Sequence, residues 1–170
     1  MTIITEIKFI DFNNKEAIKK EIDDFTQKYA YADIEHALII SPNGNTYSLT
    51  GTKGNVNSEI LGKEILRGSI IIHNHPVEYK AEQDDSFSFK DLKIANDYEL
   101  GKQYVVSGKR RDAFELTQYH TIEIETAWDN AKYEMWEKHK KNDTEVVFEQ
   151  QDILRELKIF LKGFKFYENI

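Results

Sequence analysis

The chain has 170 residues, enough to bury a core, and its 40% hydrophobic and 12% aromatic residues exclude a disordered chain. Its net charge of -7 argues against a general nucleic-acid binder, whose binding surface is usually basic. Because it has no cysteine, disulfides, cysteine zinc sites and thiol nucleophiles are excluded, and any metal must be held by His, Asp or Glu.

No apolar run approaches the length of a membrane span. Glu6, Lys8 and Asp11 interrupt the apolar residues near the N-terminus, which does not resemble a signal peptide. We therefore expect a cytoplasmic protein.

The first third of the chain alternates strand and helix patterns. Residues 2–12 are rich in β-branched side chains and predict a strand, and residues 15–29 carry apolar side chains at helical spacing. Residues 34–51 read as a hairpin, because two apolar runs flank a turn that contains Asn43-Gly44. Glu35 opens the first strand of that hairpin.

A short helix is expected next. Ser58 can cap it, Gly68 can end it, and Ile60, Leu61, Ile65 and Leu66 are expected to face inward.

The following stretch, Ile70-Ile71-Ile72-His73-Asn74-His75-Pro76, predicts a buried strand that ends in two metal ligands. Residues two apart in a strand share a face, so His73 and His75 should point the same way. Pro76 ends the strand. A His-x-His pair alone is common, and the metal prediction depends on a carboxylate nearby that supplies a third ligand.

Residues 77–87 are polar and acidic and are expected to form an exposed loop, a candidate lid. Ser88 then begins a helix that Gly101 closes. Ser88-x-x-Asp91 is a good capping box in its own right, and a ligand role for Asp91 is compatible with it because a first helical turn presents both side chains and backbone donors.

A further strand at 103–107 is followed by the basic cluster Lys109-Arg110-Arg111 in a turn. Such a cluster could touch a phosphate or an acidic partner, although solvated charges are the commoner case. From residue 121 onward, two amphipathic helices are expected. Their apolar faces are Trp128, Ala131, Met135, Trp136 and His139, and Ile153, Leu157, Phe160, Leu161 and Phe164, with Asn142-Asp143-Thr144 between the helices.

The order of these parts along the chain resembles that of the JAMM (MPN+, JAB1/MPN/Mov34) metalloprotease superfamily. The parts are Glu35, the hairpin, Gly51-Thr52, a helix, His73-Asn74-His75-Pro76 and Ser88-x-x-Asp91. The motif looks most like the RadC-type and phage-associated bacterial branch. The resemblance covers roughly residues 30–110. It differs from the common pattern in its expanded acidic loop and in Val77-Glu78, which replaces the usual Ser-Gly.

We expect an α/β fold in two parts. The resemblance implies a JAMM/MPN-like curved mixed sheet flanked by helices in residues 1–120, and the apolar spacing predicts a C-terminal helical extension in residues 121–170. The resemblance implies that His73, His75 and Asp91 bind Zn2+. It also implies that Glu35 is the general base and that Ser88 stabilises the oxyanion. Glu59 and Glu64 also precede the histidines, but Glu35 lies in the strand before the hairpin, as the family's Glu does.

The expected function is zinc-dependent hydrolysis of a peptide or isopeptide bond in a protein or peptide substrate. Two alternatives stay open. One is a metal-binding module without protease activity, whose C-terminal helices bind a protein partner. The other is a metal-dependent nuclease, which the acidic charge disfavours and the basic cluster leaves open.

Overall fold

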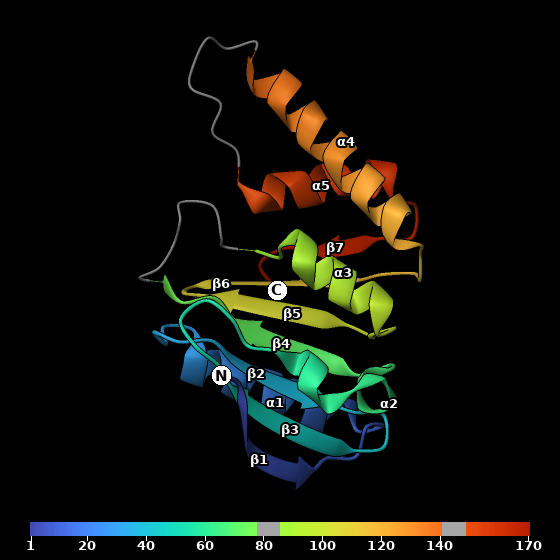
Figure 1. The fold of residues 1–170 in the computed structure, drawn as a ribbon. Coiled ribbons are helices and arrows are strands. Elements are labelled where there is room, and N and C mark those ends of the chain that lie inside the picture. Colours follow the sequence, from blue (N-terminus) through green and yellow to red (C-terminus); the bar gives the residue numbers. More distant parts are fainter. Residues whose placement is uncertain (78–85, 141–148) are drawn as a thin grey trace.

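The computed structural model of the chain describes residues 1–77, 86–140 and 149–170. Strands and helices are interspersed along the chain (Figure 1). The strands are β1 (Ile3–Phe9), β2 (His36–Ile40), β3 (Asn45–Thr50), β4 (Ile70–Asn74), β5 (Gln103–Ser107), β6 (Arg110–Glu115) and β7 (Lys165–Tyr167). The helices are α1 (Lys15–Tyr29), a 3-10 turn η1 (Ser58–Leu61), α2 (Lys63–Leu66), α3 (Phe89–Asp97), α4 (Thr121–Lys140) and α5 (Gln150–Phe160).

The strands form one open sheet in the spatial order β1-β3-β2-β4-β5-β6-β7 (Figure 1). Only β4 and β5 run parallel among the paired strands of the described ranges. The predicted mixed α/β architecture, a mixed sheet with flanking helices, is therefore confirmed. None of the helices in these ranges is long and apolar enough to cross a membrane.

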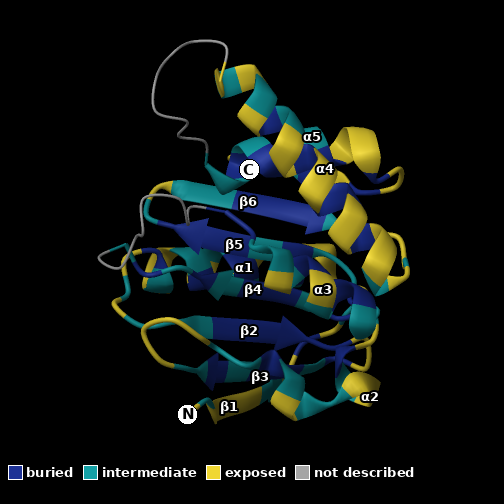
Figure 2. Ribbon diagram, turned by 45° about the horizontal axis from the view of Figure 1, so that its top comes forward, coloured by how far each residue is buried: buried dark blue, intermediate teal, exposed yellow. Residues whose placement is uncertain are grey.

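Both faces of the central strands are buried, so these strands read as continuous apolar runs. Successive side chains alternate between two cores. Helix α1 covers one face of the sheet, and helices α2 to α5 contribute to the core on the other (Figure 2). The α1 core contains Ile18, Ile22, Phe25, Leu38, Ile40, Ile72 and Val106; the opposite core contains Ile39, Ile71, Leu92, Val105, Phe114, Leu154 and Leu157.

The helix expected over residues 59–67 is interrupted. Gly62 has a φ of +76°, which breaks the chain into η1 and α2. Asn57, rather than Ser58, caps the first turn, and its side chain accepts a hydrogen bond from the backbone N–H of Glu59. Ile60 is 48% exposed, so the prediction that it faces inward was wrong.

The C-terminal region contains the two expected helices and an additional strand. Helices α4 and α5 are present, and the chain then returns to the sheet as β7, which pairs with β6. Trp136 and Phe160 are 40% and 37% exposed, so the predicted apolar faces are not wholly buried. The predicted break at Asn142-Asp143-Thr144 lies outside the described residues, and the boundary near residue 120 stays a prediction.

Candidate metal centre

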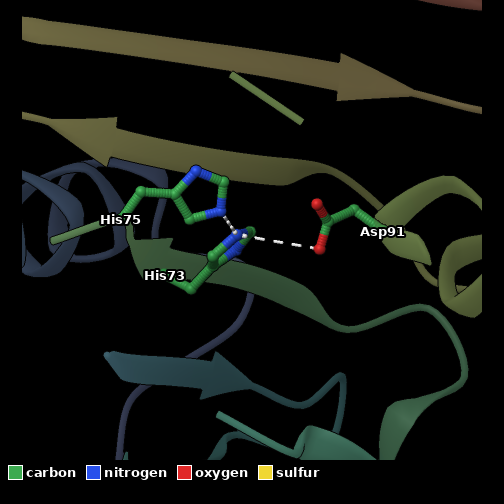
Figure 3. A group of neighbouring side chains, drawn as sticks. All are labelled: His73, His75 and Asp91. Carbon is green, nitrogen blue, oxygen red and sulfur yellow. Dashed lines mark hydrogen bonds and ion pairs between the residues drawn. The ribbon is translucent and has the colours of Figure 1, made fainter. Parts of the chain in front are cut away.

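Three side chains predicted as metal ligands converge above one end of β4 (Figure 3). Nε2 of His73 lies 3.1 Å from Nε2 of His75 and 3.7 Å from Oδ1 of Asp91. One ligand atom from each residue lies within 4.8 Å of the other two. This group could hold a metal ion, as the sequence predicted.

Strand β4 delivers both imidazoles to the same side. His73 pairs with Ala37 of β2, and the backbone N–H of His75 donates to the carbonyl of Val106 (2.9 Å), which prolongs the parallel pairing with β5. The extended backbone therefore continues through His75, and period-two alternation places both rings on one face.

The environment of His73 favours the neutral imidazole that a metal needs. Burial lowers the pKa of His73 to about 4, although the Asp91 carboxylate acts in the opposite direction. His73 therefore carries no charge near neutral pH and can offer a lone pair.

Asp91 is the third residue of α3 and belongs to a capping box with Ser88. Its Oδ2 accepts hydrogen bonds from the Ser88 hydroxyl (2.7 Å) and backbone N–H (2.8 Å), and its Oδ1 faces His73. Burial disfavours the carboxylate, but the charges of His73 and His75 and the Ser88 hydrogen bonds outweigh burial and lower the pKa of Asp91. The same Asp91 carboxylate thus caps α3 with one oxygen and faces His73 with the other.

Ser88 has a single hydroxyl hydrogen, and in this structure that hydrogen goes to Asp91. The contacts therefore identify Ser88 as the residue that orients Asp91. Its expected role towards an oxyanion stays a prediction.

Glu35 lines the same pocket as His73, His75 and Asp91. Its Oε2 accepts a hydrogen bond from the backbone N–H of Val56 (2.8 Å). Burial raises the pKa of Glu35, opposed by the charge of His75 and by the Val56 hydrogen bond. A carboxylate with a raised pKa beside a potential metal site is suited to proton transfer.

The loop that holds Glu35 depends on Gly51. A Cβ at residue 51 would lie 2.3 Å from the carbonyl oxygen of Asn55 and 2.8 Å from Cα of Val56. Only glycine lets the chain pass this closely, and the close passage brings the Val56 N–H to Glu35. The glycine of the Gly51-Thr52 pair is therefore required by the close packing of the chain next to the site.

The pocket has a volume of about 110 Å³. Besides the predicted site residues, its wall includes Asn55 and Lys90, whose ammonium donates to Oδ1 of Asn55 (3.0 Å). Neither Glu59 nor Glu64 is among the lining residues. Of the three glutamates considered, the geometry thus favours Glu35.

Sequence reasoning missed Phe87, which it placed in an exposed loop. Ser86 and Phe87 are completely buried; Phe87 packs edge-on against Phe114 (ring centroids 4.5 Å apart) and beside His73 (6.1 Å). The ring thus contacts His73 of β4 and Phe114 of β6 on one face of the sheet, and no local sequence pattern indicates these contacts. Of the predicted lid, residues 77–87, the stretch 78–85 lies outside the described residues.

Of the basic cluster, Lys109 lies in an exposed turn, as the sequence predicts, whereas the two arginines lie in β6 and form ion pairs. Arg110 begins β6 and pairs with Asp112 (2.7 Å) and Glu168 (3.2 Å). Arg111 pairs with Asp23 (2.8 Å). Both guanidinium groups therefore tie β6 to other parts of the chain.

Comparison of the chain with protein-family models, curated proteins and solved structures finds no match. The fold and the side chains define it as a mixed α/β protein with a His-His-Asp group that could hold a metal ion.

Proposed function

We propose that the protein is a zinc-dependent hydrolase of the JAMM type, which cleaves a peptide or isopeptide bond. One observation carries the proposal: His73, His75 and Asp91 converge in a pocket that Glu35 also lines. These four residues come from separate parts of the sequence, and their meeting in one pocket is what a metal-dependent hydrolase requires.

The donor set suits zinc. Two imidazole nitrogens and one carboxylate oxygen are a common catalytic combination, which leaves the fourth position open. Tetrahedral zinc with bonds of about 2.1 Å places its ligand atoms about 3.4 Å apart. The two separations that involve His73, 3.1 and 3.7 Å, lie on either side of this value, and all three ligand atoms lie within 4.8 Å of one another.

His73, His75 and Asp91 would hold the zinc ion, which would supply an activated water and a Lewis acid. Glu35 would accept a proton at its carboxylate and return it to the leaving amine, and its raised pKa favours both transfers. Ser88 holds Asp91 through Oδ2 and leaves Oδ1 to face His73.

Zinc content tests the ligand assignment. Elemental analysis and competitive titration of untagged protein should give about one zinc per chain, and Asp91→Ala should weaken affinity by more than about 100-fold, since even outer-shell partners are worth about 10- to 100-fold. Asp97→Ala is the matched control, because Asp97 lies in the same helix and bonds Lys93 and Thr121. Equal affinities for the two variants would contradict the assignment.

Glu35→Gln separates metal binding from catalysis. The substitution keeps the shape of the side chain but removes the proton acceptor, so zinc content should stay and hydrolysis should fall by at least about 100-fold, the lower range for general-base catalysis. The assay uses quenched peptide libraries and lysine-isopeptide substrates. Hydrolysis by Glu35→Gln at the wild-type rate would refute the role of Glu35.

The two alternatives predict different results. A metal-binding module would bind zinc through the same ligands, show no hydrolysis in wild type, and use the C-terminal helices to bind a protein. A nuclease would cleave DNA or RNA in a metal-dependent and salt-sensitive way. The pairing of Arg110 and Arg111 inside the chain gives this last alternative little support.

A further inference from the structure

Asn74 lies between the two histidines in the chain but faces away from them. It is completely buried, and its side chain makes two hydrogen bonds to the backbone of the segment that leads into β2. Oδ1 accepts from the N–H of His36 (2.6 Å), and Nδ2 donates to the carbonyl of Ile34 (3.0 Å). The two bonded residues are the immediate neighbours of Glu35.

The side chain substitutes for strand pairing at this point. The β2–β4 ladder runs from Ile40↔Ile70 to Ala37↔His73 and ends there. One residue further along, the Asn74 amide binds the backbone on both sides of Glu35 instead. On its other edge, the Glu35 backbone is paired with Gly51 and Thr52 (both 2.8 Å).

Only an amide offers both groups in this arrangement. A carboxamide presents an acceptor and a donor side by side in one plane, as successive peptide groups of a strand do, whereas a carboxylate of Asp lacks the donor and Leu lacks both. Without the Asn74 amide, the N–H of His36 and the carbonyl of Ile34 would lose their partners in a partly buried place.

We propose that Asn74 is a positioning residue that fixes Glu35 relative to the metal ligands, an inference that rests on the proposed function. The peptide backbone joins Asn74 directly to His73 and His75, and two hydrogen bonds join it to the residues on either side of Glu35. The ligand strand and the base-carrying segment are thereby held in one register. The Val56 N–H then holds the carboxylate itself.

Amide hydrogen exchange of the full chain tests this inference without a substrate. In Asn74→Leu, which keeps the approximate volume, the amides of His36 and Val56 should exchange at least about tenfold faster, as expected for one lost hydrogen bond. Val56 decides the outcome, because its N–H bonds Glu35 rather than Asn74. Glu35→Ala gives the exchange rate of the Val56 amide without the carboxylate.

Asn96→Leu is the matched control for the loss of a buried asparagine. Asn96 is 8% exposed, and its Oδ1 accepts from the backbone N–H of Tyr119. This variant should speed exchange at Tyr119 and leave Val56 unchanged. If Asn74→Leu does not fold, Asn74→Ser retains a hydroxyl that is too short to bridge both groups and should show the same pattern.

Unchanged exchange at Val56 in both Asn74 variants would overturn the inference, as would a uniform rise along β2. Zinc affinity, measured in parallel, should fall far less than in Asp91→Ala, because no ligand is altered. Absence of zinc binding by the wild-type protein would refute the proposed function, whereas the exchange pattern is measured on the metal-free chain and is judged separately.

Discussion

Ser88 and Asp91 show how two residues can serve the fold and the site together. In most helices a capping box only satisfies backbone donors. Here the second carboxylate oxygen of Asp91 faces His73, so the hydrogen bonds that cap α3 also set the direction of a candidate ligand. A change at Ser88 should therefore affect both stability and metal binding.

Ser88→Ala should lower the free energy of unfolding by about 1 kcal/mol through the lost cap and weaken zinc affinity by about tenfold through the loosened carboxylate. The matched control is Asn14→Ala, because Asn14 caps α1 by accepting a hydrogen bond from Ala17 (3.0 Å) far from the ligands. Urea denaturation and zinc titration of both variants give the comparison. If zinc affinity is the same in both, Ser88 does not orient Asp91.

Much of the candidate site could be predicted at the residue scale, because it depends on local rules. Alternation along a strand placed His73 and His75 on one face, and the helix cap placed Asp91 in a first turn. The partners that hold these residues could not be predicted. Phe87 and Val56 reach the site through long-range packing and loop geometry, for which the sequence carries no periodic signal.

At the scale of elements, the connection after β3 decides whether Glu35 is held. Residues 52–56 fold back across Gly51, with a bridge between Thr52 and Asn55. The hairpin itself follows a strong turn signal, since Gly44 has a φ of +89°. Residues 52–56 can fold back over residue 51 only because that residue has no side chain.

Gly51→Ala should lower the free energy of unfolding by about 1–3 kcal/mol, the cost of forcing a methyl group into a closely packed place. Gly54→Ala is the control, since its Cβ would meet no atom within 4 Å and should change stability by less than about 0.5 kcal/mol. Thermal and urea denaturation measure both. Equal losses of unfolding free energy in the two variants would show that residues 52–56 can move away from Glu35 and make room for the methyl group at no cost.

Elements with strong local signals were predicted well, and those that depend on distant partners were not. Helix α1 matches the expected range because a cap precedes a regular apolar face. In the helix expected at 59–67, Gly62 at positive φ breaks the pattern. Strand β7 is only three residues long and depends on its pairing with β6, so the sequence alone predicts only a helical region there.

At the scale of the whole molecule, the spatial order of the strands brings the site together. β4 lies between β2 and β5, so the histidines stand at the centre of the sheet between the Glu35 segment and the connection that leads through α3. Chain order does not determine this arrangement, since β1 pairs with β3 and β7 returns to the far edge. The sequence predicts a mixed sheet, but no local sequence pattern indicates the spatial order of its strands.

A buried histidine at the centre of the sheet also links the stability of the metal-free protein to pH. The folded-state pKa of His73 is lowered to about 4, while the unfolded chain takes up a proton near the ordinary value of 6.5. Between these two values the unfolded state binds more protons, so stability falls as pH falls from about 6.5 to 4. His36, whose pKa burial also lowers, acts in the same direction.

For His73 alone, the expected loss over this window is up to about 3 kcal/mol of unfolding free energy, measured by urea denaturation in the presence of a chelator. His73→Gln removes the titrating ring, so it should lose less stability between pH 7 and pH 4, and the difference between the two curves separates His73, together with the Asp91 carboxylate that it faces, from His36. Identical pH dependence in both proteins would mean that the His73 ring is open to solvent without metal. The neutral His73 ligand that the proposed zinc site requires would then be absent.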